Sequence, residues 1–493
     1  MLFPTTDFAI FFIVVFSASW LLRTRPVAWK CMILAASLIF YGWWNWRFVA
    51  LLVASIVVNQ TGALLVSRDT ASPWRRRALL GTVAADVGLL GWFKYYGFFS
   101  VNVDNGLHRL GLAAPLTVVQ VALPVGISFF TFMGISYVVD CYRETIRPGG
   151  WLDAAVYLAF FPHLVAGPIV RGSELLPQLK TLREPKRIDA SRAAWLIMAG
   201  LAKKVVISSF LARAIVDPVF ALPGQHSALE VLVAIYGYAV QIYADFSGYT
   251  DIAIGIALLL GFTFPENFNA PYAAISIQDF WRRWHMTLSH WLRDYVYIPL
   301  GGSRGGMWRT SLNLMLTMLV GGLWHGAKWT FVAWGAFHGG AQVVGMLRRR
   351  RETDASRPRP MPAAVPSGSL LVAAARTDAP ARSTSRVWVS RLVTFHLVCL
   401  GWVLFRSDSF HAAVQLLSRL AHPGSSPLVT PLVLSAIAVS IASQYVPAGA
   451  VARAQRRLAD LAPLTQGAIL AGSMYLITLL GPQGVAPFIY YRF

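Results

Sequence analysis

The 493-residue sequence has few charged side chains, which excludes an ordinary soluble protein. Asp, Glu, Lys and Arg make up only 13% of the residues, against about 25% in soluble domains. Hydrophobic residues make up 56%, and the mean hydropathy is +0.54. A soluble fold of this length needs more polar surface than the sequence supplies. The composition therefore predicts a membrane protein.

Cysteines and common nucleotide or hydrolase motifs are also scarce. The cysteines, Cys31, Cys141 and Cys399, lie in or beside apolar runs and form no C-x-x-C pair. This disfavours a disulfide framework or a cysteine zinc site, and it predicts that they are small buried apolar residues. No P-loop, G-x-S-x-G turn or Rossmann glycine pattern stands in a suitable context, which disfavours an ATPase or a serine hydrolase.

Acidic residues are outnumbered: 22 Asp and Glu face 43 Lys and Arg, for a net charge of +21. The basic residues form short clusters between apolar runs, such as Arg75–Arg77 and Arg348–Arg351. This distribution is typical of the positive-inside rule and of contacts with anionic membrane lipids. It disfavours nucleic acid as a partner.

Apolar runs near the length of a bilayer-spanning helix, roughly 20 residues, recur from Phe8 to Pro482. They predict an all-α polytopic membrane protein with roughly 11–13 membrane helices plus re-entrant and interfacial helices. The first run lacks a preceding basic segment and a cleavage site, so it is read as an anchor. The basic loops 23–30 and 68–77 predict an N-terminus outside the cytosol. Breakers at Pro162, Gly167 and Pro168 predict a re-entrant segment.

One segment differs in composition. Residues 348–391 contain ten Arg, three acidic residues and five Pro, which predicts a disordered, mobile cytosolic linker without a catalytic role. It would divide the membrane domain into an N-terminal and catalytic part, 1–347, and C-terminal membrane helices, 392–493.

The segment 276–295, SIQDFWRRWHMTLSHWLRDY, predicts one amphipathic helix in the membrane interface. Ser276 and Asp279 form a helix-start signal. His285 lies at the edge of the aromatic face, and His290 lies with the arginines. Their spacing of five residues, rather than four, argues against a zinc pair, so no metal site is predicted.

The apolar segment 311–347 is flanked by basic residues on both sides, which predicts a path across the membrane and back. Gly321, Gly322 and Gly326 predict a break between the two helices, with His325 at the break. An ionisable residue at membrane depth suggests function, although a neutral imidazole bonded to a carbonyl is an equal alternative. His338 and His163 are predicted to be structural.

Asp245 and Asp251 interrupt the apolar run 228–262, which is ~50 Å long as one helix. We expect a break near Ser247–Gly248 and carboxylates that face the bundle interior. The two carboxylates have either a functional role or a structural one in ion pairs with arginines.

Ordered motifs spread over most of the chain resemble the membrane-bound O-acyltransferase superfamily, and within it the membrane subunits of alginate O-acetyltransferases. The motifs are FYGWWNWRF, FKYYGFF, PVGISFFTFMGISYVVDCYR, FPHLVAGPIVR, QIYADFSGYTDIAIG, FPENFNAPY, DFWRRWHMTLSHWLRDYVYIPLGG, GGLWHGAKWTFVAWGAFHG, GWVLFRSDSF and the C-terminal FIYYRF. The linker 348–391 departs from the family pattern.

The resemblance implies a ring of helices around a tunnel that is thinnest at its centre. It implies that His325 is the central membrane histidine and His285 the second one. The donor would be acetyl-CoA or another acyl thioester on the cytosolic side, with no bound cofactor. The acceptor hydroxyl would approach from outside. Periplasmic partner proteins would pass the acetyl group to a polysaccharide, and the chain would lie in a bacterial inner membrane.

This chemistry needs a base for the hydroxyl proton and a group that stabilises the oxyanion. The hypothesis is that His325 is the base, that His285 positions the thioester or the acceptor, and that Trp324 and Trp281 wall the tunnel. Further residues of these motifs are expected to contact the tunnel or the substrate: Trp284, Asp245, Asp251, Asn269 and Arg171.

Two alternatives stay open. One is an acyltransferase with another cargo, such as D-alanine passed from a carrier protein to teichoic acid; the identity of the donor distinguishes the two enzymes. The other is a transporter or flippase in which the membrane His and Asp residues relay protons.

Overall fold

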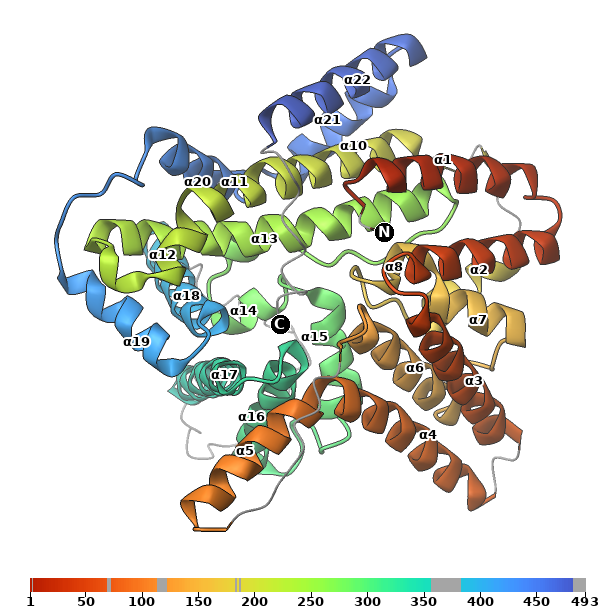
Figure 1. Ribbon diagram of the computed structural model, residues 1–493, viewed down its shortest axis with the longest axis horizontal. Helices are drawn as coiled ribbons and strands as arrows, with labels where there is room; N and C mark the ends of the chain where they lie inside the picture. Colours follow the sequence, from red (N-terminus) through yellow and green to blue (C-terminus); the bar gives the residue numbers. More distant parts are fainter. Residues whose placement is uncertain are drawn as a thin grey trace, which may run out of the picture.

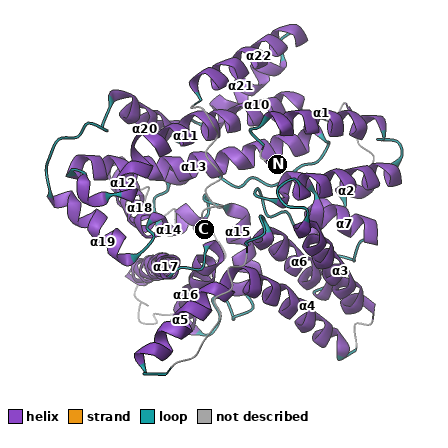
Figure 2. Ribbon diagram, viewed as in Figure 1, coloured by secondary structure: helices purple, strands orange, loops and turns teal. Residues whose placement is uncertain are grey.

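A computed structural model describes residues 1, 3–68, 72–112, 122–181, 184–185, 188–355 and 383–481. Every regular element in these ranges is a helix, as Figure 2 shows. The predicted all-α class is therefore confirmed. The helices of the first half are α1 Thr6–Leu21, α2 Pro26–Gly42, α3 Arg47–Arg68, α4 Trp74–Leu90, the π-helical turn η1 Gly91–Tyr95, α5 Tyr96–Arg109, α6 Ile127–Tyr142, α7 Trp151–Ala159, α8 Phe161–Leu164, α9 Gly172–Leu175 and η2 Gln178–Lys180.

The helices of the second half continue the same architecture around a long central helix, α13 (Figure 1). They are α10 Ala190–Leu201, the π-helical turn η4 Ala202–Ser208, α11 Ser209–Leu211, η5 Ala212–Val216, α12 Asp217–Ala221, η6 Pro223–Gln225, α13 Ala228–Leu259, η7 Pro271–Ala273, α14 Ile277–Trp281, α15 Met286–Leu292, η8 Arg293–Tyr297, α16 Gly306–His325, α17 Trp329–Ala355, α18 Thr384–Arg406, α19 Phe410–Ser418, η9 Arg419–Ala421, α20 Pro431–Ser443, α21 Ala448–Ala459 and α22 Pro463–Leu480.

Several helices are long and apolar enough to cross a membrane. By length and composition, five in the described ranges qualify: α3, the stretch Ala190–Ala221 that contains α10 to α12, α13, α18 and α22. The pair α20 and α21, bent by 96°, makes a sixth if it counts as one span. The helices α1, α2 and α6 are apolar but shorter. The predicted total of 11–13 is therefore reached only if short and interrupted helices cross as well.

The central helix α13 differs from the expectation, because it runs unbroken through Ser247 and Gly248. Gly248 is needed for a close helix crossing instead of a break. A Cβ atom there would lie 2.7 Å from the carbonyl oxygen of Gly200, closer than side-chain atoms can approach. Glycine thus lets α10 and η4 pack directly against α13. The predicted break in 228–262 was wrong.

The segment 276–295 also differs, because it is not one helix. Ser276 begins α14 as predicted, and its hydroxyl accepts a hydrogen bond from the Asp279 N–H at 3.1 Å. However, α14 ends at Trp281 and α15 begins at Met286. Between them, His285 has a left-handed backbone with φ +42°. A left-handed residue interrupts the helical hydrogen-bond ladder, and this turn lies near the middle of the molecule in Figure 1.

Two other predicted breaks are present. The chain turns between α16 and α17 directly after His325, as the glycines predicted. It also breaks between α7 and α8, and residues 165–171 that follow α8 form no regular helix. The re-entrant character of that segment stays a prediction.

The linker prediction is wrong at both ends. Residues 348–355 belong to α17, and residues 384–391 belong to α18. Basic residues are good helix formers, so the helices extend beyond the apolar runs. The central part, 356–382, and the C-terminal FIYYRF lie outside the described residues. The division of the chain at this segment stays a prediction. Among the cysteines, Cys141 and Cys399 are buried as predicted, but Cys31 is exposed.

Candidate active site

His325 occupies the last position of α16, where the backbone opens into an extended conformation at Gly326. The turn is tight because glycines line it. A Cβ atom on Gly322 would lie 2.3 Å from the carbonyl oxygen of Phe331 in α17. Only glycine allows this approach, which brings α17 directly against the end of α16. The sequence thus fixes His325 where the two helices meet.

Aromatic rings surround the His325 imidazole, which is only 3% exposed. The ring centroids of Trp324, Trp334 and Phe405 lie 4.9, 5.0 and 5.0 Å from its own, all in edge-on arrangements. An imidazole held in such a low-dielectric environment interacts strongly with any charge or dipole that a substrate brings.

His285 lies on the other side of Trp324. Its ring centroid is 5.6 Å from the Trp324 ring and 4.6 Å from the Phe246 ring of α13. The side chain is fully buried, and neither ring nitrogen has a hydrogen-bond partner within the described part of the chain. An unsatisfied buried polar group costs about 1–3 kcal/mol. Such a cost is typical of a site that awaits a ligand.

Asn267 fixes the backbone around His285. Its side-chain oxygen accepts hydrogen bonds from the N–H and the hydroxyl of Thr287, at 3.2 and 3.0 Å. Its carbonyl oxygen accepts one from the N–H of Met286 at 2.9 Å. The sequence favoured Asn269, two residues further along the motif FPENFNAPY. However, Asn269 is exposed, and hydrogen bonds join its main chain to Arg283. Asn267 was missed because both asparagines have the same sequence context.

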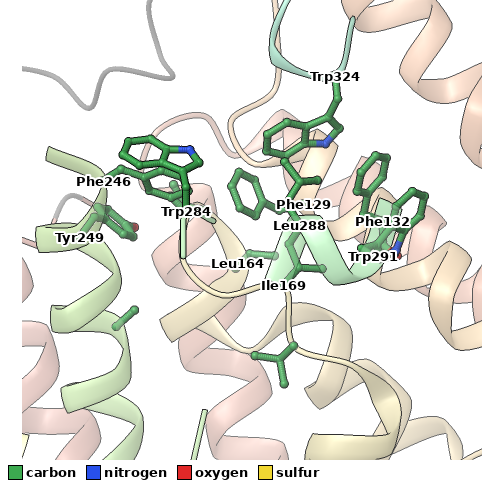
Figure 3. Packing of buried hydrophobic residues seen from close by; sticks show 14 of the residues in the cluster. Phe129, Phe132, Leu164, Ile169, Phe246, Tyr249, Trp284, Leu288, Trp291 and Trp324 are labelled. Carbon is green, nitrogen blue, oxygen red and sulfur yellow. The ribbon is translucent and has the colours of Figure 1, made fainter. Parts of the chain in front are cut away.

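Aromatic rings pack around Trp324 and form an aromatic wall beside the two histidines. Figure 3 shows Trp324 above Phe129, with Phe132 stacked on Trp291 to one side and Trp284 near Phe246 on the other. Phe129 and Phe132 contact Trp324 at centroid distances of 5.5 and 5.7 Å. Trp284 is 1% exposed. The rings come from α6, α13, α15, α16 and the turn before α15, so the wall depends on the packing of several helices.

A cavity of about 440 Å³ lies next to this wall, between α15, α16 and α17. Its charged lining consists of Arg282, Arg293, Arg349 and His290. Trp281 also lines it, and the Trp281 ring lies 5.6 Å from Trp334, which contacts His325. The lining of this cavity, as far as the described residues form it, does not include His325. The continuous tunnel therefore stays a prediction.

The cavity approaches the histidine along α16. Met318 lines the cavity, and it precedes His325 by seven residues, or about 10 Å of helix. Thr310, near the start of the same helix, lines the cavity as well. The cavity thus follows α16 from its basic end towards the histidine.

Two predicted site residues, Asp245 and Asp251, form ion pairs with lysines instead of arginines. The Nζ atom of Lys204 lies 2.5 Å from the carboxylate of Asp245, and both side chains are buried. The Nζ atom of Lys203 lies 2.5 Å from Asp251, and this pair is partly exposed. Both lysines come from the π-helical turn η4. The structural role that the sequence left open is therefore the one that the contacts support.

Arg171 is also occupied elsewhere. Its guanidinium bonds the carboxylate of Asp294 at 2.7 Å and lies 5.3 Å from the Tyr295 ring. Arg143 lies 5.4 Å from the same ring. The two guanidiniums and Asp294 hold η8 against α6 and α9, so the geometry assigns Arg171 to the support of the cavity rim.

The remaining histidines are placed as expected. His163 is buried, bonds the Tyr157 carbonyl at 2.9 Å and stacks on Phe264. His338 is buried and accepts a hydrogen bond from the Trp281 indole at 3.3 Å. His290 is exposed with the arginines at the cavity.

Comparison with known proteins agrees with the helical membrane architecture. Residues 8–361 match the model of the membrane-bound O-acyltransferase family, MBOAT. The chain belongs to this family, and it is an O-acyltransferase of the multi-pass membrane type.

Several relatives cover most of the chain. A protein of Azotobacter vinelandii named "Probable alginate O-acetylase AlgI" is 38% identical over 85% of this chain and 78% of its own length. A peptidoglycan O-acetyltransferase of Helicobacter pylori is 35% identical over 80% of this chain and 74% of its own length. A teichoic acid D-alanyltransferase of Bacillus subtilis is 27% identical over 58% of this chain and 69% of its own length.

Proposed function

We propose that the protein transfers an acetyl group from acetyl-CoA to an acceptor hydroxyl on the far side of the membrane, for the O-acetylation of an exported polysaccharide such as alginate. The observation that carries the proposal is the pair of buried histidines on either side of Trp324, beside an arginine-lined cavity. The alginate and peptidoglycan O-acetylating relatives support the acetyl group as cargo.

In this proposal His325 is the general base. The acceptor hydroxyl oxygen attacks the thioester carbonyl carbon while the imidazole takes the hydroxyl proton. The carbonyl electron pair moves to oxygen and forms a tetrahedral oxyanion. When the C=O bond re-forms, the C–S bond breaks and the leaving thiolate takes the proton from the imidazolium. His285, whose ring nitrogens have no partner among the described residues, bonds the thioester or the acceptor.

The donor would occupy the cavity between α15, α16 and α17. Arg282, Arg293 and Arg349 line it, and guanidinium groups suit the phosphates of acetyl-CoA. Arg309 and Arg348–Arg351 mark the ends of α16 and α17 that border the cavity. By the positive-inside rule these ends would face the cytosol and the N-terminus would lie outside, and the proposed location is a bacterial inner membrane.

The acceptor side would engage periplasmic proteins that receive the acetyl group and pass it to the polysaccharide. The alternative cargo, D-alanine from a carrier protein, rests on the B. subtilis relative. The arginine-lined cavity favours acetyl-CoA, because a free nucleotide donor carries its phosphates into the site.

The identity of the donor tests the proposal. Membranes that contain the protein are incubated with labelled acetyl-CoA or with a D-alanyl carrier protein, and release of the free thiol is measured. We expect release from acetyl-CoA alone, and a raised KM for acetyl-CoA in Arg282→Ala. Thiol release only from the carrier protein would favour D-alanyl transfer, and substrate movement without thioester cleavage would favour a transporter.

A further inference from the structure

The end of the His325 helix is held by two side chains from a distant segment. The hydroxyl of Tyr95 donates to the carbonyl oxygen of Leu323 at 2.6 Å. The ammonium of Lys94 donates to the carbonyl oxygen of Trp324. These are two of the last four carbonyl groups of α16, which have no partner inside the helix. Lys94 and Tyr95 therefore cap the helix that carries His325.

Both residues lie in η1, a π-helical turn between α4 and α5. Turns of this type are rare and occur often at functional sites. Lys94 lies more than 200 positions from Trp324 in the sequence, so the contact joins the N-terminal helices to the site.

The amine of Lys94 has no acidic partner among the described residues, and its neighbours are hydrogen-bond acceptors that suit an ammonium. The ammonium donates to the hydroxyl of Ser128 at 3.1 Å and to the Trp324 carbonyl. It lies 5.8 Å from the centroid of the Trp324 ring. No carboxylate in the described ranges forms an ion pair with it, in contrast to Lys203 and Lys204. A helix C-terminus stabilises such a cation, but the two groups that it bonds, a hydroxyl and a carbonyl, are both neutral.

The position of this charge relates it to the reaction. The Trp324 ring contacts the ammonium of Lys94, the imidazole of His325 and the imidazole of His285. The tetrahedral intermediate of the proposed reaction develops a negative charge in the same region. A fixed cation nearby lowers the free energy of that intermediate more than that of the neutral substrates.

We propose that Lys94 is an electrostatic positioning residue, which holds the end of α16 and places an uncompensated positive charge beside the His325 site. This inference rests on the proposed function. It predicts that the charge affects the chemical step and that the binding of the donor depends little on it. Tyr95 shares the capping contact and lacks the charge, so it serves as the matched comparison.

The test compares Lys94→Met, Lys94→Arg and Tyr95→Phe, with His325→Ala as the site control. Each variant is made in the full chain, and membranes with equal amounts of folded protein are assayed for CoA release from acetyl-CoA. We expect Lys94→Met to lower kcat about 10²-fold, the scale of one lost oxyanion-stabilising group. The KM for acetyl-CoA should stay close to the wild-type value.

The other variants separate charge from capping. Lys94→Arg keeps the charge and a donor, so it should recover a large part of the rate. Tyr95→Phe loses one neutral hydrogen bond, so its kcat should fall less than about 10-fold. Lys328→Met is a surface control, because Lys328 lies near His325 in sequence but bonds Asp408 at 2.8 Å; its rate should be unchanged.

Two results would overturn the role of Lys94, and a third would overturn the proposed function. A wild-type kcat in Lys94→Met removes the role of Lys94. Equal losses in Lys94→Met, Lys94→Arg and Tyr95→Phe reduce Lys94 to a helix cap and also overturn the proposal. Full activity in His325→Ala refutes the proposed function itself, whatever the Lys94 variants show. If Lys94→Met does not accumulate, Lys94→Gln replaces it with the same expectation, since its amide can cap the carbonyl without the charge.

Discussion

The buried ion pair between Lys204 and Asp245 should be a structural element of the bundle rather than a part of the catalytic machinery. Its Nζ–carboxylate distance is 2.5 Å, and the side chains are only 1% and 4% exposed. Removing one partner of a buried pair leaves an uncompensated charge, which costs about 3–5 kcal/mol. Asp245→Ala should therefore lower the thermal unfolding midpoint in detergent strongly.

Two further variants test whether the loss of stability in Asp245→Ala comes from the unpaired buried charge. The double variant Asp245→Leu/Lys204→Met removes both charges, and most of the lost stability should return because a buried apolar pair is often as stable as the ion pair. Asp251→Ala should cost less than Asp245→Ala, because the pair with Lys203 is 20–26% exposed and water solvates the remaining charge.

The activity of the same proteins decides between the two roles. Per folded molecule, the double variant should retain most of the wild-type transfer rate. If Asp245→Ala unfolds at the wild-type temperature and the double variant is stable but inactive, the carboxylate acts on substrate and the structural assignment is refuted.

Two further predictions follow from the geometry of the site. Gly322→Ala should sharply reduce the amount of folded protein, because the new methyl group would lie 2.3 Å from the Phe331 carbonyl oxygen. Gly340→Ala is the control, since a methyl group there meets nothing within 4 Å and the variant should accumulate normally. Fluorescence-detected size exclusion compares the two yields, and equal yields would contradict the close packing. His285→Gly should keep or raise the thermal stability, because it removes an unsatisfied imidazole and glycine suits the φ of +42°. The rate of acetyl transfer should fall at least about 100-fold, the scale of a lost alignment in an active site. A normal transfer rate with lower stability would make His285 a structural residue.

The sequence predicted those features that depend on local backbone chemistry. Glycines on both sides of His325 predicted the helix break there, and Ser276 predicted the start of α14. The aromatic pattern after it pointed to Trp281 and Trp284, which lie at the cavity and near Phe246, respectively. These features follow from residue type and spacing alone, so they can be predicted without tertiary contacts.

Other features depend on contacts that the sequence does not reveal. Gly248 has the appearance of a helix breaker, but the backbone of Gly200 packs against it. His285 was expected inside a helix, and its left-handed conformation requires Asn267 to hold the next residues. Lys94 belongs to a recognised motif, but only the fold brings it to the carbonyl of Trp324. Each of these depends on a neighbour that is distant in sequence.

The central claim is that the imidazole of His325 takes the proton of the acceptor hydroxyl. The most direct measurement is the acetyl-ester content of the envelope polysaccharide, by mass analysis, in a strain that lacks the chromosomal copy and expresses either the wild-type protein or His325→Gln. The variant keeps a polar side chain of similar size but has no basic nitrogen. The account predicts that folded variant protein accumulates normally in the membrane and that acetyl esters disappear. Wild-type acetylation by the variant would contradict it.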